Sequence, residues 1–442
     1  MLFSRADLRR LLIPLLLEQA LVVLIGMMDT VMVSSCGEAA VSGVSLVDSV
    51  NILLINVFSA LATGGAVVTS QYLGKRDREN AGKAAKMLFY VVLLCSTVIM
   101  AVCLILRRPI LSTVFGAIEP EVMEAAMTYF LLSALSYPFL AMYNGSCALL
   151  RAMGDAKTTL YSSAAMNVIN ICGNALTIYG LGWGVMGAGL ATLVSRMVGA
   201  VVTQLALHNP HGMIPYPNLR RWEWQGNIVR MILHVGVPNG MENGLFQMGK
   251  LLLLGMVSTF GTVSIAANAV GNSITTFQVL PGSAVGLAMI TVVGRCVGAH
   301  EFEQARYYIK RLMLLAYACM SVLNIVMLLF TPLLASAYHL SPETEALARQ
   351  IVMIHGIGCI FIWPASFVLP NALRAAGDTR FTMMVSVFSM LAFRVVSGYL
   401  LGSVLGLGVI GVWLAMQIDW LFRVALFLWR LRSGRWESKA LV

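Results

Sequence analysis

The sequence predicts an all-α integral membrane protein, and three observations support this fold class. Of 442 residues, 59% are hydrophobic and only 11% are charged, whereas about a quarter of an ordinary soluble domain is charged. The mean hydropathy is +0.82. The apolar residues also recur in separate runs, each long enough to cross roughly 30 Å of hydrocarbon. Disorder and a secreted disulfide framework are excluded, because most of the eight cysteines lie inside these runs.

We expect twelve transmembrane helices, an even number that places both termini on one side of the membrane. The first span is too long for a cleaved signal peptide and contains Glu18 and Asp29. The predicted spans are residues 11–33, 46–73, 87–106, 125–149, 158–180, 186–207, 231–257, 268–293, 312–335, 350–372, 382–402 and 408–429.

The basic residues predict the orientation of these spans. With a cytoplasmic N-terminus, most of the 30 Lys and Arg residues fall on the cytoplasmic side, and Arg107, Arg108 and Arg349 are the three assigned to the outside. This bias favours cytoplasmic termini. The net charge of +10 is therefore a topology signal, and we expect no nucleic-acid partner.

An internal repeat relates the two halves of the chain. Placing residue n on residue n+224 aligns Pro14 with Pro238 and Glu18 with Glu242. With one residue removed, the segment RAMGD falls on the segment RAAGD. Each half contains six spans, so the halves share an orientation, as in many alternating-access transporters.

The domain organisation follows from this repeat. We predict an N-lobe at residues 1–207, a cytoplasmic linker rich in proline and polar residues at 208–227, and a C-lobe at 228–442. The two parallel-repeat lobes of six helices each should surround a central cleft, where a substrate would bind.

Several motifs in a fixed order carry a family resemblance. They are MMDTVMVSS in the first span, SQYLGKRDRENAGK and GRCVGAHEFEQA after the second and eighth spans, the RAMGD and RAAGD segments, and GVMGAGLAT in the sixth span. Together they resemble the multidrug and toxic compound extrusion (MATE) transporters, within a wider group that includes polysaccharide and lipid-linked flippases. The resemblance covers nearly the whole chain.

The resemblance implies secondary-active antiport in a prokaryotic inner membrane. Inward Na⁺ or H⁺ would drive export of amphipathic, cationic organic compounds while the two lobes rock about the cleft. We expect a monomer in the lipid bilayer, without a cofactor beyond the coupling ion. Enzymatic activity is not expected, because Walker, zinc-binding and nucleophile motifs are absent. A flippase of a lipid-linked precursor, or a membrane-embedded enzyme or scaffold without transport, remains an alternative.

Asp29 is the first candidate for ion coupling. It lies fifteen residues after Pro14, which places it about 22 Å along the first span. A carboxylate at this depth is costly, so a functional role is the default interpretation. The resemblance agrees, because the D-T-V-M context is similar to that of the family's cation-binding carboxylate.

Asn170 and Asn174 share a face of the fifth span, and the resemblance implies that Thr192 joins them with Asp29 in a cation site. These hard oxygen ligands suit Na⁺, whereas the carboxylate alone suffices for H⁺. Asn174 stands where the DinF-like branch carries a second Asp, so the coupling ion stays open. The alternative role for the two asparagines is interhelical hydrogen bonding.

The expected cleft residues include two acids at equivalent places. Glu18 and Glu242 lie near the cytoplasmic ends of spans one and seven, where they could line the mouth of the cleft and attract cations. Alternatively, each interacts with the positive N-terminus of its own helix.

In the C-lobe, Phe246 and Trp363 align with the acids of NorM-like members, so we expect no ion coupling there. They should supply an aromatic cleft wall together with Gln247. Lys250 must face water or pair with an acid; an open lysine would favour anionic or zwitterionic cargo, and a paired one would leave cationic cargo. We expect the other charged C-lobe span residues, Arg394, Arg423 and Asp419, to snorkel or to pair locally.

Overall fold

The computed structural model describes residues 2–116, 119–208, 212–215, 219, 221–336, 338 and 340–442, without the side chains of residues 25, 27, 29 and 30. This part of the chain is almost entirely helical and contains no strand. The predicted all-α class is confirmed.

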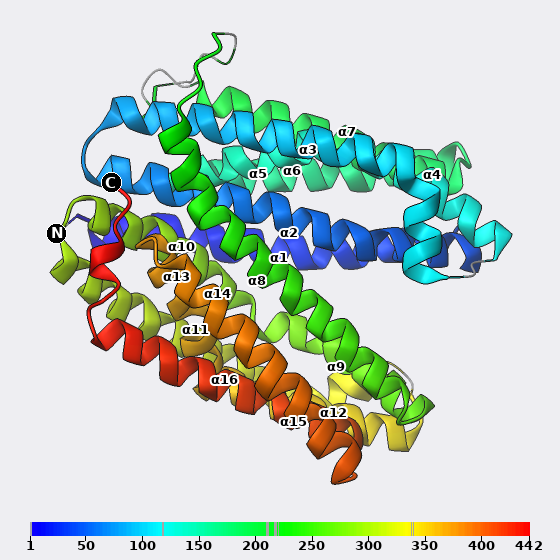
Figure 1. Cartoon of the computed structure of the whole chain (residues 1–442). Coiled ribbons are helices and arrows are strands. Elements are labelled where there is room, and N and C mark those ends of the chain that lie inside the picture. The colour runs from blue at the N-terminus through cyan, green and yellow to red at the C-terminus, as the bar shows by residue number, and fades with distance from the viewer. Residues whose placement is uncertain are drawn as a thin grey trace. The chain divides into compact units, whose positions relative to one another are not determined.

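Long helices dominate both halves of the chain (Figure 1). The first half contains α1 (Arg5–Ser34), α2 (Glu38–Gly74), α3 (Arg78–Phe115), α4 (Pro120–Leu135), α5 (Tyr137–Ala152), α6 (Ala156–Asn174) and α7 (Gly184–Leu207). The second half contains α8 (Gly226–Ser258), α9 (Thr262–Gln278), α10 (Leu280–Gly298), α11 (Phe302–Ser336), α12 (Pro342–Phe361), α13 (Leu369–Ala375), α14 (Thr379–Ser389), α15 (Val396–Tyr399) and α16 (Gly408–Arg432).

These helices follow the twelve predicted spans one for one when interrupted helices are joined. By length and apolarity alone, seven helices of the described chain could cross a membrane, or up to nine if each of two bent pairs is one span. Some of the other segments are shorter, such as α9 with 17 residues, and some carry more polar residues. In α6, for example, Ser162, Ser163 and Asn170 are buried inside the protein, as expected of a span that faces other helices rather than lipid.

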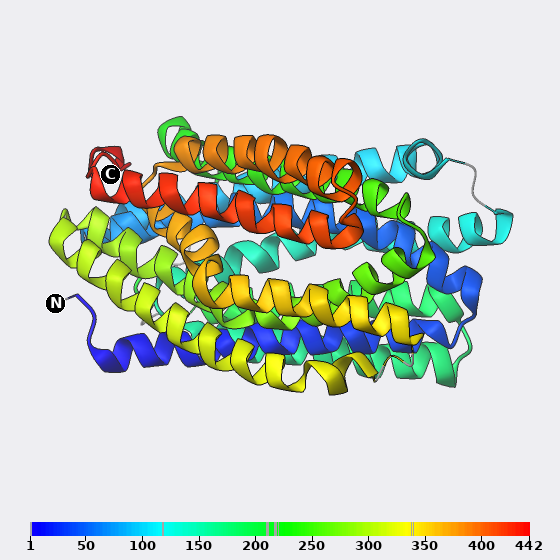
Figure 2. The ribbon, with the colours of Figure 1, turned by 90° about the horizontal axis from the view of Figure 1, so that it is seen from below.

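Prolines explain the interruptions. The pair α4 and α5 is bent by 47°, and α12 is bent by 65° from the segment that begins at Pro364. Figure 2 shows the second bend, where the ribbon changes from yellow to orange. Pro138 and Pro364 occupy the first turn after each bend, because proline cannot donate the backbone hydrogen bond that would continue the helix.

The backbone repeats the pattern seen in the sequence. Gly37 has a φ of 101° and Gly261 one of 93°, while Arg76 has 62° and His300 has 56°. Each pair is 224 positions apart. Positive φ is uncommon for residues other than glycine, so its recurrence at Arg76 and His300 shows that the two halves share the same turn geometry.

One extra residue in the second half is accommodated by a π-helical segment. Gly154 corresponds to Gly377 at a spacing of 223, whereas Gly182 corresponds to Gly406 at 224. Between these points α14 continues into a π-helical segment, Met390–Val395, where the equivalent part of α6 is regular α-helix. Since π turns close with i→i+5 hydrogen bonds, this segment absorbs the extra residue and changes the directions of its side chains.

Contacts divide the chain into two compact units. The N-unit is Arg5–Gly240, and the C-unit is Met241–Val442 together with the residues up to Ser4. The boundary between them falls inside α8. The predicted lobe boundaries at the 208–227 linker stay a prediction.

Residues 2 and 3 are fastened to the C-unit. The backbone N–H of Leu2 donates to Gln304 Oε1 at 2.8 Å. The N–H of Phe3 donates to the Tyr308 hydroxyl at 3.0 Å, and that hydroxyl donates to the carbonyl of Phe3 at 2.7 Å. The Phe3 ring packs edge-on against Tyr308, with the Arg295 guanidinium 5.5 Å from its centre. This clasp precedes α1, which belongs to the N-unit.

Candidate functional site

Three predicted cation-site residues lie together in the N-unit and form the N-unit polar cluster: Asn170, Asn174 and Thr192. Asn170 Nδ2 donates to Thr192 Oγ1 at 3.3 Å, and Asn174 Nδ2 donates to Asn170 Oδ1 at 3.4 Å. Thr192 Oγ1 donates to the carbonyl of Ala188 at 3.0 Å. All three side chains are buried. The hydrogen bond from Asn170 to Thr192 joins α6 to α7. The cluster therefore also fits the alternative role, in which the asparagines hold two helices together.

The chemistry of this cluster fits a monovalent ion. Its three side-chain oxygens are neutral and hard, which suits Na⁺ better than a soft transition metal. The helix becomes π-helical directly after Asn174, at Ala175–Gly180, and such segments are frequent at functional sites. Within the described residues, no group of three or more His, Cys, Asp or Glu side chains could hold a metal ion.

Asp29, the predicted carboxylate partner of this cluster, lies in α1. Its side chain lies outside the described part of the structure. The participation of Asp29 in a cation site therefore stays a prediction.

The two equivalent acids each pair with an arginine. Glu18 Oε1 lies 3.3 Å from Arg151 Nη1, and Glu242 Oε1 lies 2.7 Å from Arg374 Nη2. Both glutamates are buried, with 6% and 7% of their surface exposed. The arginines belong to the RAMGD and RAAGD segments. Both acids are thus engaged by fixed cations, and neither predicted role for them included this pairing.

The two ion pairs differ in their second oxygen. Glu18 Oε2 accepts a hydrogen bond from the Thr159 hydroxyl at 2.8 Å. Glu242 Oε2 is buried and accepts no hydrogen bond from the described residues. The C-unit pair therefore has the shorter nitrogen–oxygen distance, but the second oxygen of its glutamate has no hydrogen-bond donor among the described residues.

The aromatic residues Phe246 and Trp363 both contact Phe367 in the C-unit, and their role as a cleft wall stays a prediction. Trp363 stacks on Phe367 with ring centres 5.0 Å apart, and Phe367 packs edge-on against Phe246 at 6.2 Å. Phe367 also meets the edge of Trp420 at 5.7 Å. Gln247 follows Phe246 on α8 and is half-buried.

Three cations surround the ring of Phe246 and form what we term the basic cluster: Lys250, Arg394 and Arg423. Lys250 Nζ lies 5.1 Å from the ring centre, Arg394 Cζ 5.2 Å and Arg423 Cζ 5.4 Å. Each cation–π contact is worth about 0.5–2 kcal/mol, far less than the cost of removing a charge from water. The ring alone does not compensate these charges.

Asp419 is the acid nearest to these cations among the described residues, and it forms an ion pair with Arg423. Its Oδ1 accepts from Arg423 Nε at 3.0 Å and also from the Ser389 hydroxyl. Arg394 Nη1 stays 3.8 Å from Oδ2, too far for a hydrogen bond. The expectation that these residues snorkel or pair locally is confirmed as local pairing for Arg423 and Asp419, which are four positions apart, and Arg394 lies within ion-pair distance of the same acid. All three are buried, with exposed fractions of 8% for Arg394, 2% for Arg423 and 0% for Asp419.

Lys250 has an exposed side chain, and no acid of the described chain lies within ion-pair distance of it. Glu242, the partner considered for it, pairs with Arg374 instead. The open-lysine alternative thus agrees with the geometry.

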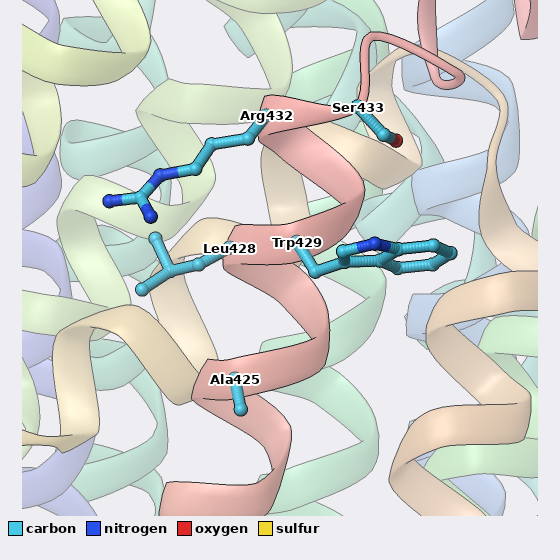
Figure 3. A pocket seen from close by; sticks show the side chains of 5 residues that line it. All are labelled: Ala425, Leu428, Trp429, Arg432 and Ser433. Carbon is cyan, nitrogen blue, oxygen red and sulfur yellow. The ribbon is translucent and has the colours of Figure 1, made fainter.

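A hollow beside the end of α16 contributes no further site. Figure 3 shows Leu428 and Arg432 leaving the helix on one side and Trp429 on the other. A hollow made by a single helix encloses no ligand, and Trp and Arg at the end of a span are typical membrane-interface anchors. Its lining residues are Ala425, Leu428, Trp429, Arg432 and Ser433.

Comparisons with known proteins agree with the repeat. A model of the MatE family matches residues 14–176 and 238–400. The "uncharacterized transporter YisQ" of Bacillus subtilis is 26% identical over 435 residues, covering 97% of this chain and 94% of the relative. The "probable multidrug resistance protein NorM" of Thermotoga maritima is 27% identical over 453 residues, covering 99% of this chain and 94% of the relative.

Solved structures share the fold. A MATE protein in the straight conformation has a TM-score of 0.91 at 22% identity, with 98% of this chain and 96% of that chain covered. A MOP superfamily transporter from Pyrococcus furiosus, for which a reversed polarity of the binding pocket suggests a different function, has a TM-score of 0.89 at 22% identity, with coverage of 97% and 96%.

Proposed function

Because this chain belongs to the MatE family of multi-pass membrane transporters, which are not enzymes, we propose that it exports amphipathic organic compounds in exchange for Na⁺ or H⁺. Because the family resemblance implies cationic cargo, cationic compounds are the first to test. We further propose alternating access by two rocking lobes, because the duplicated six-helix halves are the kind of repeat on which such transporters are built.

The N-unit polar cluster is the observation that carries this proposal. Burying two amides and a hydroxyl inside membrane spans is costly unless they are satisfied or functional. Here Asn170 donates to Thr192 and Asn174 donates to Asn170 through long bonds of 3.3 and 3.4 Å, which an ion could replace by direct coordination of the oxygens. An ion that binds one conformation better than the other shifts their populations, as coupling requires.

In this mechanism Asp29 supplies the negative charge and the cluster supplies neutral oxygens. If H⁺ is the ion, protonation of Asp29 removes its charge, and the cluster fixes the position of the carboxyl group. If Na⁺ is the ion, Asn174 and Thr192 complete its coordination. In both versions the ion enters from the outside, neutralises Asp29, and favours the state that releases cargo outward.

The second candidate function is a flippase of a lipid-linked precursor. The basic cluster favours it, because three cations around Phe246 would attract an anionic headgroup.

The central experiment uses proteoliposomes that contain a fluorescent organic dye and carry an imposed Na⁺ or H⁺ gradient. Asp29→Asn should keep the protein in the membrane but abolish uphill dye export, because the ion no longer distinguishes the two states. Glu38→Gln, which alters an exposed acid at the start of α2, should behave as wild type. Uphill export by Asp29→Asn at the wild-type rate would make Asp29 structural and refute the mechanism.

Companion variants separate the two ions. Asn174→Ala and Thr192→Ala should shift the Na⁺ dependence of export if Na⁺ is the ion, and should change little if H⁺ is. If neither a Na⁺ nor a H⁺ gradient drives export, ion-coupled antiport is excluded.

The proposed orientation is tested by labelling. Single cysteines in place of Arg78 and Pro342, in a cysteine-free background, should react with an impermeant thiol reagent from opposite sides of the membrane. Labelling from the same side would exclude the proposed topology.

A further inference from the structure

The turn of α6 that carries Asn170 is regular α-helix. The corresponding turn in the second half is the π-helical segment Met390–Val395, which carries Arg394. The N-unit thus has a neutral amide that could accept a mobile cation, whereas the C-unit has a permanent cation at the corresponding turn. A guanidinium keeps its proton in proteins, so this charge is always present.

The surrounding charges do not balance. The basic cluster contributes three cations, and Asp419 is the single acid of the described residues that lies within ion-pair distance of any of them. Asp419 Oδ1 is already taken by Arg423 and Ser389. Two positive charges remain without an acid of their own.

Arg394 shows this deficit most clearly. It is 92% buried, since its exposed fraction is 8%, yet its Nε and Nη1 atoms donate no hydrogen bond to the described residues. A buried donor left unsatisfied is costly, and a charged one more so. Lys250 adds an exposed ammonium 5.1 Å from the centre of the same Phe246 ring. We infer that the missing acceptor comes from outside the protein.

We propose that the basic cluster binds an anionic group, a carboxylate or a phosphate, of an amphipathic cargo. Arg394 and Lys250 donate to this group, and the aromatic stack of Phe246, Phe367 and Trp363 contacts the apolar part of the same molecule. This inference rests on the proposed transport function and deepens it. It changes the expected cargo from purely cationic to anionic or zwitterionic compounds.

The test compares two xanthene dyes of similar shape and opposite charge, fluorescein and rhodamine 6G. Binding to the purified, nanodisc-embedded protein is measured by fluorescence anisotropy, and export is measured from proteoliposomes. Wild-type protein should bind and export fluorescein. Loss of one charge-assisted donor in Arg394→Gln or Lys250→Gln should weaken fluorescein binding about tenfold or more, with rhodamine 6G binding unchanged or improved.

Matched variants make the result specific. Lys250→Arg keeps the charge and should retain fluorescein binding. Arg196→Gln alters an intramembrane arginine of the N-unit that donates to Ser136, and it should leave the affinities for both dyes unchanged. Because Lys250 is exposed, its variants should fold even if Arg394→Gln does not.

The outcomes separate this inference from the proposed function. Ion-driven export of rhodamine 6G without binding of fluorescein would overturn the anionic site while supporting the antiporter. Unchanged fluorescein affinity in both Lys250→Gln and a folded Arg394→Gln would also overturn it. Fluorescein binding that depends on Lys250, without ion-driven export of either dye, would support the site and reject antiport. Bilayer translocation of a fluorescent phosphatidic acid, lost in Lys250→Gln, would assign the phosphate to a lipid cargo.

Discussion

The repeated glutamate–arginine pairs lead to the sharpest stability prediction. The Glu242–Arg374 distance is 2.7 Å, and the Glu18–Arg151 distance is 3.3 Å. At an effective dielectric constant of about 20, these separations correspond to attractions of about 6 and about 5 kcal/mol before desolvation is subtracted. Removing one partner of a buried pair costs about 3–5 kcal/mol, because the other charge is left uncompensated.

We expect Glu242→Gln to lose about 3–5 kcal/mol of unfolding free energy. Glu18→Gln should lose less, because the new amide can still accept the hydrogen bond from Thr159. A double-mutant cycle with Arg374→Gln should give a coupling free energy of about 2 kcal/mol or more, within the range for residues of one ion-pair network.

The assay is unfolding in dodecyl maltoside micelles with increasing dodecyl sulfate, followed by the reaction of buried cysteines with a fluorogenic thiol dye. Cys147 reports on the N-unit, and Cys296 and Cys359 report on the C-unit. The partly exposed pair Glu345–Arg349 is the control, for which we expect coupling of about 1 kcal/mol or less. A Glu242→Gln variant that unfolds like wild type but binds rhodamine 6G more weakly would show that Glu242 serves the cargo.

Two further predictions concern the N-unit. A Cβ at Gly64 would lie 2.4 Å from the backbone oxygen of Ile232, so Gly64→Ala should destabilise the protein by about 1–3 kcal/mol in the same assay, whereas Gly244→Ala, which meets open space, should not; equal stability of both variants would contradict this packing. The hydrogen bond from Lys86 lowers the pKa of Glu223 in the linker, so this contact stabilises the linker at neutral pH and is lost as the pH falls through the lowered pKa. Glu223→Gln should therefore speed tryptic cleavage of the linker at neutral pH, and an unchanged rate would show that the contact does not hold it.

The local pattern predicted most of the fold, because a span of apolar residues has few alternatives in lipid. The repeat also fixed the correspondence of Glu18 with Glu242 and of RAMGD with RAAGD. It did not show that these two features touch, since the paired residues are 133 and 132 positions apart. The sequence nevertheless contained a hint of the pairing, because the glutamate and the arginine both recur at equivalent positions in the two halves.

The basic cluster was harder to predict for a physical reason. Arg394 was expected to reach the membrane surface or pair locally, because a buried arginine in a span is rare. Its position depends on a single inserted residue that α14 absorbs as a π turn, and such a turn leaves no local mark in the amino-acid pattern. Phe246 and Trp363, by contrast, were identified through the family resemblance, and both lie in the aromatic stack around Phe367.

The clasp of residues 2 and 3 on α11 has a consequence for biosynthesis. Tyr308 follows Phe3 by 305 positions, and at about 5–20 residues per second the ribosome needs roughly 15–60 s to make that stretch. During this interval α1 and most later spans can enter the bilayer while Phe3 still lacks its partner. The clasp can therefore form only after the start of α11 has been made, so an early-made segment waits for a helix made much later.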